Sequence, residues 1–156
     1  MLHTMPSLED QHRITRLKTP EECRQFMLNA EAKQPDLVPV ARRHAIELKI
    51  GQHAFETDVS RDIWRVVYAR EEVIFFTNKK NLKARHIRKS IEHRGEIEAV
   101  AAIVRKPAGE GFELQHALGL GDYTFEAVVI RHPHHFDADL VKIAQEKQAM
   151  RMQSPK

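Results

Sequence analysis

Apolar residues recur at helical spacing along most of this chain. One such stripe, at positions i, i+3, i+4 and i+7, consists of Cys23, Phe26, Met27 and Ala30. The run Thr19-Pro20-Glu21-Glu22 just before it supplies a capping hydroxyl, a proline at the first helical position and a glutamate three residues after the cap. No segment alternates apolar and polar residues between turns, and no Asn-Gly or Asp-Gly hairpin signal occurs. The sequence therefore predicts an all-α fold.

Proline and glycine separate the apolar stripes into short helices. We expect helices over about residues 20–33, 37–49, 58–77, 82–94, 96–104, 112–118, 124–131 and 137–147. The segment 58–77 has apolar side chains over a wide arc, which is typical of a central helix packed from more than one side. We therefore expect one compact domain at 19–150, with six to eight short helices around this long one. Residues 1–18 are expected to form a flexible N-terminal arm, and residues 151–156 a frayed tail.

The composition fits such a domain. With 156 residues, 42% hydrophobic and 30% charged, the chain can build one core but is too short for two ordinary domains. The single cysteine, Cys23, excludes an internal disulfide framework and a cysteine-rich zinc module. No apolar run approaches the roughly 20 residues that cross a bilayer, and residues 1–10 lack the apolar core of a secretory signal. We expect a soluble, cytoplasmic protein with no membrane partner.

Basic residues are concentrated in one segment, residues 78–94, which we term the basic strip. The strip holds seven lysines and arginines against Glu92 alone, whereas the rest of the chain holds 18 basic and 21 acidic residues. An ordinary exposed helix alternates glutamate with lysine, because pairs at i, i+4 stabilise it. Seven cations with one counter-charge repel one another unless a partner screens them. Such a local asymmetry is typical of a site that binds a polyanion.

The candidate binding residues are the cations on the exposed side of the strip's helix and at its entry. They are Lys79, Lys80, Lys83, Arg85, Arg88 and Lys89. At 100° per residue, the last three lie within one arc, away from Ile87 and Ile91. Arginine can contact guanine through two hydrogen bonds and lysine neutralises phosphate, so the mixture favours DNA. We expect a helical domain that binds double-stranded DNA, with RNA left open; six phosphate contacts give a log–log salt slope of about −5.

Two other functions stay open. In one, the strip docks on an acidic protein partner or on a second copy of the chain, as in a homodimer, and the protein is a helical adaptor. In the other, Pro35-Asp36 and Glu47-Leu48-Lys49 form a PD-(D/E)xK nuclease pattern, in which the acids bind Mg²⁺ and the lysine polarises the attacking water. That nuclease needs a mixed sheet, and the helical stripe that continues through Leu48 argues against one.

No catalytic residue, metal site or cofactor is expected. The densest histidine group, His132-Pro133-His134-His135, lies between two predicted helices, where nothing fixes the ligand geometry that a transition metal needs. Cys23 falls on a buried stripe, where it acts as a small hydrophobe rather than a nucleophile. The sequence therefore favours a binding protein over an enzyme.

Several longer sequence runs resemble those of a known group of proteins. They begin at Thr19-Pro-Glu-Glu-Cys, Ala41-Arg-Arg-His-Ala-Ile-Glu-Leu, Tyr68-Ala-Arg-Glu-Glu-Val and Phe125-Glu-Ala-Val-Val-Ile-Arg-His-Pro. Over about residues 19–145 the chain resembles an uncharacterised family of small all-helical bacterial proteins, in which the counterpart of residues 78–91 also looks basic. The resemblance implies a helical fold and a bacterial, cytoplasmic origin. It implies no activity and no site residues.

Overall fold

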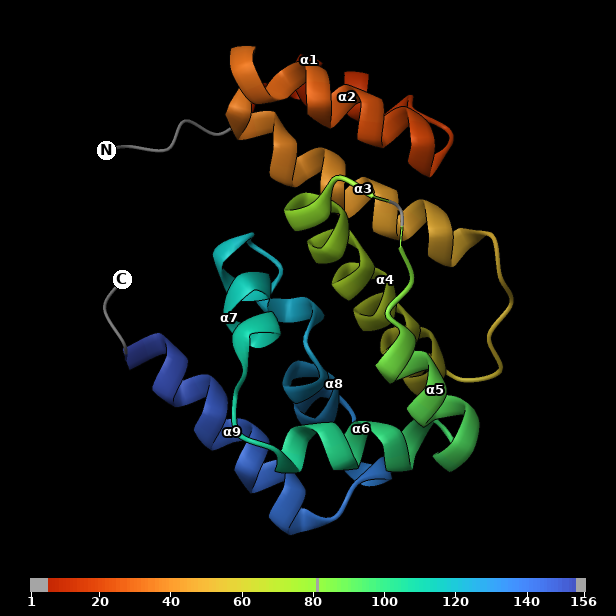
Figure 1. Ribbon diagram of the computed structural model, residues 1–156, viewed down its shortest axis with the longest axis vertical. Helices are drawn as coiled ribbons and strands as arrows, with labels where there is room; N and C mark the ends of the chain where they lie inside the picture. The colour runs from red at the N-terminus through yellow and green to blue at the C-terminus, as the bar shows by residue number, and fades with distance from the viewer. Residues whose placement is uncertain (1–5, 81, 154–156) are drawn as a thin grey trace. The chain divides into compact units, whose positions relative to one another are not determined.

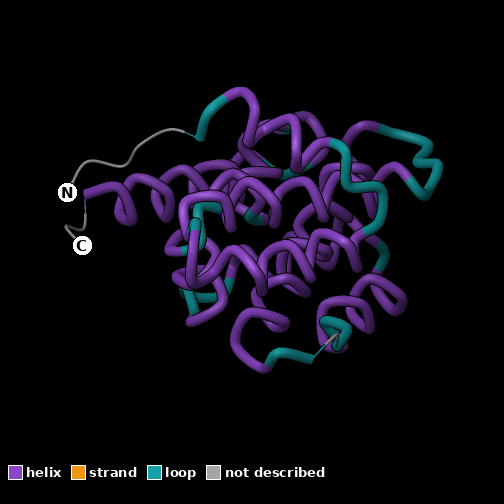
Figure 2. Tube along the Cα trace, turned by 90° about the horizontal axis from the view of Figure 1, so that it is seen from above, coloured by secondary structure: helices purple, strands orange, loops and turns teal. Residues whose placement is uncertain are grey.

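The computed structural model describes residues 6–80 and 82–153. Throughout these residues the regular structure is helical, and Figure 2 shows helices joined by loops with no strand among them. The all-α fold class predicted from the apolar spacing is thereby confirmed. None of the described helices is both long and apolar enough to cross a membrane. The chain divides into two compact units, residues 1–54 and 55–156, and we describe each by itself.

The first unit comprises α1 (Leu8–Thr15), α2 (Pro20–Lys33), a 3₁₀ turn η1 (Pro35–Leu37) and α3 (Val38–Gly51). α2 begins with the predicted capping box. The Thr19 hydroxyl accepts from the Glu22 N–H at 3.1 Å, and the Glu22 carboxylate accepts from the Thr19 N–H at 3.0 Å. α2 and α3 pack against each other, and α1 packs on α3.

The first unit differs from the sequence prediction at residues 8–15, where α1 replaces part of the expected loose arm. Ser7 caps this helix by accepting from the Asp10 N–H at 3.1 Å, and Ile14 is fully buried in a cluster with residues of α2 and α3. One buried residue in eight is too weak a pattern to tell from a polar coil. Residues 1–5 and 154–156 lie outside the described residues, and the single domain at 19–150 stays a prediction.

The second unit is built around α4 (Asp58–Asn78), which Figure 1 shows between the other helices of this unit. These are, in chain order, α5 (Arg85–Arg94), α6 (Glu96–Arg105), α7 (Glu110–Ala117), η2 (Gly121–Tyr123), α8 (Phe125–Arg131), η3 (Pro133–His135) and α9 (Ala138–Gln153). α4 contacts α6, α7 and α8, as predicted for a central helix packed from several sides. Its N-cap is Thr57, whose hydroxyl accepts from the Ser60 N–H at 3.1 Å.

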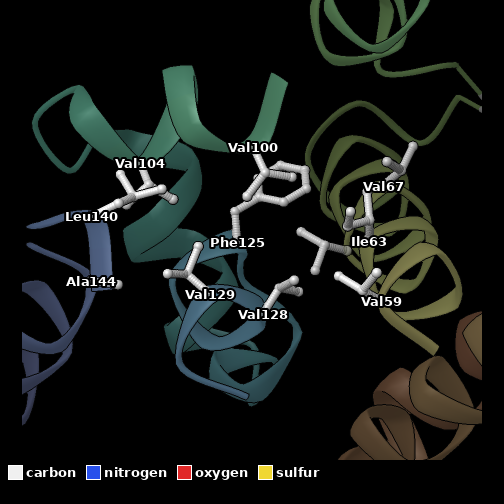
Figure 3. Close-up of a cluster of buried hydrophobic side chains, with 11 residues drawn as sticks. Val59, Ile63, Val67, Val100, Val104, Phe125, Val128, Val129, Leu140 and Ala144 are labelled. Atoms are coloured by element: carbon white, nitrogen blue, oxygen red, sulfur yellow. The ribbon is translucent and has the colours of Figure 1, made fainter. Parts of the chain in front are cut away.

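The core of the second unit gathers apolar side chains from α4, α6, α8 and α9. Figure 3 shows Ile63 of α4 beside Val128 of α8, with Phe125 between α4 and Val100 of α6. Leu140 extends the cluster into α9, whereas α5 has no fully buried residue and meets the cluster only through partly buried isoleucines. Burial of this apolar surface provides the scaffold on which α5 is mounted.

α5 begins three residues later than the sequence predicts, at Arg85 rather than Leu82. Before it, the Leu82 N–H donates to the carbonyl of Lys80 at 2.9 Å, and the Arg85 N–H donates to the carbonyl of Lys83 at 3.0 Å. The N–H of Ala84, which lies between Lys83 and Arg85, donates to the carboxylate of Glu71 at 2.8 Å. A hydrogen bond to a distant helix therefore sets where α5 starts, and helical periodicity alone cannot reveal it.

Candidate nucleic-acid interface

Most of the predicted binding residues are exposed along one stretch of the second unit. These exposed residues are Lys79, Lys80, Lys83, Arg85 and Lys89. Lys79 is the C-cap of α4, with φ 58° and ψ 25° in the left-handed region, and its Nζ lies 5.4 Å from the centre of the Phe76 ring. The next two lysines lie in the connection to α5, and the last two cations lie one turn apart on α5 itself.

This stretch presents cations with little counter-charge. Among the described residues, none forms an ion pair with Lys80, Lys83, Arg85 or Lys89. α5 has no acidic residue in its first turn, and its N-cap residue, Ala84, has no polar side chain to cap it; the Ala84 N–H donates instead to the buried Glu71 of α4. Cations at the positive end of a helix dipole are unfavourable, and within α5 and its preceding connection the buried Glu71 offsets only Arg88 directly.

Arg88, the sixth predicted residue, is held by α4. Its Nε donates to Oε2 of Glu71 at 2.6 Å and its Nη2 donates to Oε1 at 3.0 Å. The Glu71 side chain is 1% exposed, whereas that of Arg88 is 31% exposed. Since Glu71 also accepts from the Ala84 N–H, one buried carboxylate fixes both the start and the middle of α5.

Two aromatic rings of α4 complete the surroundings of Arg88. Its guanidinium carbon lies 5.3 Å from the centre of the Trp64 ring and 5.8 Å from that of Tyr68, within the range of cation–π attraction. The hydrogen bond to Glu71 raises the pKa of Arg88, and burial raises the pKa of Tyr68. Arg88 is therefore charged and Tyr68 neutral at ordinary pH.

Glu71 is a site residue that sequence reasoning missed. Glu71 follows Val67 at i+4 and precedes Ile74 by three residues, so it lies on an apolar stripe of its helix. A carboxylate on such a stripe indicates a buried, paired charge, and that signal is present in the sequence. The partner is not identifiable there, because several arginines of the basic strip satisfy the same requirement.

A second ion cluster, centred on the buried Asp62, connects α8 to α4. The buried carboxylate of Asp62 accepts from Arg131 Nε at 2.7 Å and Nη2 at 3.0 Å, and it lies 2.9 Å from Nε2 of His132. His132 belongs to the histidine group considered above as a metal candidate. Within the part of the chain that the structure describes, no group of three or more histidine, cysteine or acidic side chains has the arrangement to hold a metal ion. The cluster supports the fold by joining two helices of the second unit.

The residues of the PD-(D/E)xK pattern lie in the first unit. Asp36 is in η1, and Glu47 and Lys49 are in α3. The nuclease chemistry requires Glu and Lys on one face of a strand, and residues 6–80 and 82–153 contain no strand. The pattern therefore lacks the structural context that gives it meaning.

Comparisons with known proteins assign no function. No family model matches the chain, and searches of curated proteins and of solved structures find no match. This outcome is consistent with the resemblance to an uncharacterised family of small helical proteins.

Proposed function

We propose that this protein binds double-stranded DNA through α5 and the connection that precedes it. The observation that carries the proposal is the group of exposed cations that meet no acidic partner among the described residues, Lys80, Lys83, Arg85 and Lys89. DNA supplies the missing counter-charge and releases condensed ions on binding, which is a major source of affinity in such complexes. A bacterial, cytoplasmic setting belongs to the same proposal and rests on the sequence alone.

The dimensions of α5 support a duplex over other polyanions. Ten residues make a helix of about 15 Å, and the major groove, about 12 Å wide, admits one α-helix. Arg85 and Lys89 are exposed on one face of α5, whereas Ile87 and Arg88 attach it to the core and to α4. α5 can therefore enter a groove with its exposed face while Ile87 and Arg88 keep their contacts with the rest of the protein.

The strip has two roles in this proposal. The exposed residues, Lys79, Lys80, Lys83, Arg85 and Lys89, contact phosphates or base edges. Arg88 holds α5 against Glu71, and a DNA contact by Arg88 stays a prediction. Five contacts instead of six give an expected salt slope of about −4.5.

Fluorescence anisotropy of a labelled duplex, titrated with the protein between about 50 and 300 mM salt, tests the proposal. Single-stranded DNA and RNA of the same length are titrated alongside. Tighter binding of the duplex than of the other two ligands, with a log–log salt slope of about −4.5, supports the proposal. Tighter binding of RNA than of the duplex shows instead that RNA is the ligand. Absence of binding at low salt overturns it and makes the adaptor for an acidic protein the function to test.

A further inference from the structure

A cavity of about 240 Å³ opens between α6 and the start of α9. Its less exposed lining is apolar and includes Ile97, Ala102, Phe136 and Leu140. Its exposed rim is charged and consists of Arg94, Glu98, Arg105, His135 and Asp137. Sites for drug-sized ligands measure about 300–1,000 Å³, so this cavity has room for little more than one ring system.

The rim carries both signs of charge. Arg105 pairs with Asp137 at 3.6 Å and with Asp139 at 3.4 Å, whereas no described residue forms an ion pair with Arg94 or Glu98. An anion in the cavity would face Glu98, and a cation would face Arg94. A neutral, flat ring with hydrogen-bond donors and acceptors on its edge satisfies both side chains. A nucleobase has this chemistry, since it stacks on apolar and aromatic groups and is read at its edge.

Arg94 joins the cavity to the basic strip. It is the last residue of α5 and also lines the cavity. Gly95, with φ 86°, then turns the chain into α6, and Figure 1 shows α6 running from the end of α5 to α9. Arg94 lies about 140° around the helix from Lys89, so a nucleic-acid strand that follows the exposed cations of α5 has to pass around the C-terminal end of this helix to reach the cavity.

We infer that this cavity accepts one unstacked nucleobase of the nucleic acid that the basic strip binds. The inference rests on the proposed function, because the strip brings the strand to the cavity. Phe136 supplies the aromatic contact, and Arg94 and Glu98 supply the donor and acceptor at the edge of the base. A free nucleoside has the same ring chemistry, and the experiment separates the two sources.

The test compares three labelled duplexes by anisotropy: a fully paired one, one with a single extra adenine, and one with an abasic residue in place of that adenine. The protein is expected to prefer the adenine bulge over the abasic bulge at least about fivefold, the lower end of what one stacked base contributes. Ala102→Phe fills the cavity and should bring this ratio to about one without changing affinity for the paired duplex. Ala149→Phe, an equal change at an exposed position of α9 outside the cavity, should leave the ratio intact.

Two further measurements keep the inference decidable. If circular dichroism shows that Ala102→Phe does not fold, the exposed rim variant Glu98→Ala takes its place and should lower the ratio. 2-Aminopurine in place of the extra adenine should change its fluorescence when the wild-type protein binds. Equal affinity of the wild-type protein for the two bulged duplexes overturns the inference and leaves the proposed function standing.

Failure of all duplexes to bind overturns the proposed function, and a titration with free adenosine then decides about the cavity. If adenosine binds the wild-type protein and Ala149→Phe but does not bind Ala102→Phe, the cavity is a site for a free nucleoside. Absence of adenosine binding overturns the inference as well.

Discussion

Glu71 of α4 and Arg88 of α5 form an ion pair with two hydrogen bonds, 2.6 Å from Nε to Oε2 and 3.0 Å from Nη2 to Oε1. Because Glu71 is buried and also accepts from the Ala84 N–H, this pair determines where α5 begins and which of its faces is exposed. A guanidinium within the most basic segment of the chain thus supports the helix that carries the other cations.

Removing one partner of this pair should be costly. Arg88→Met leaves the buried Glu71 carboxylate without its counter-charge, and we expect the free energy of unfolding to fall by about 3–5 kcal/mol. The double variant Glu71→Gln/Arg88→Met removes both charges and should recover most of that loss. Urea unfolding followed by circular dichroism measures both. A loss below about 1 kcal/mol in Arg88→Met would show that the pair contributes no more than an exposed one.

The Asp62 cluster gives a second, independent prediction. Asp62→Asn removes the charge that receives two hydrogen bonds from Arg131, and because the Arg131 side chain is partly exposed, the free energy of unfolding should fall by about 1.5–3 kcal/mol. Asp139→Asn is the control, since Asp139 is 70% exposed and its pair with Arg105 should contribute less than about 1 kcal/mol. Similar effects of the two substitutions in urea unfolding would contradict the account of the buried cluster.

A side chain at Gly95, between α5 and α6, should lower the stability of the fold. Its φ of 86° with ψ of 164° is open to glycine and strained for other residues, so Gly95→Ala should cost about 1–3 kcal/mol. Gly109→Ala is a matched control, because Gly109 has a φ of −107° and an added Cβ meets nothing within 4 Å at either position. The difference between the two thermal midpoints isolates the backbone strain, and equal midpoints would argue against it.

His116 should make stability depend on pH. Burial lowers the pKa of His116, so between its folded pKa and the ordinary value of about 6.5 the unfolded chain binds more protons than the folded one. Its stabilising effect is therefore complete above about pH 6.5 and is lost as the pH falls through that window. Thermal midpoints at about pH 7.5 and 5.5 should fall less on acidification in His116→Gln than in the wild type. The exposed His134→Gln should behave like the wild type; an unchanged pH response in His116→Gln would refute the assignment.

The predictable part of the fold is the part set by neighbours in sequence. The predicted Thr19 cap is confirmed, because it acts on residues within one turn, and Thr124 and Gly95 act over the same short range at the start of α8 and the end of α5. The predicted start of α5 is wrong by three residues, because the start depends on the hydrogen bond from the Ala84 N–H to Glu71, 13 positions earlier in the chain. α1 was missed because its helix is stabilised by packing of Ile14 rather than by a sequence pattern.

The candidate site also has a part that the sequence predicts and a part that only the structure shows. Local charge composition identifies the cations of the basic strip, since it requires no knowledge of the fold. The pairing of Arg88 with Glu71 and the cavity between α6 and α9 depend on how distant helices pack. Arg94 is visible in the sequence as one more cation, and only the structure places it at the edge of a cavity.

The salt dependence of duplex binding tests the central claim most directly. Wild-type protein should give a log–log slope of about −4.5, and the triple variant Lys83→Ala/Arg85→Ala/Lys89→Ala should reduce it to about −2. Lys106→Ala/Lys142→Ala, which removes two exposed lysines outside the strip, should keep the wild-type slope. An unchanged slope in a triple variant with wild-type helical content would contradict the claim that α5 and its preceding connection bind DNA.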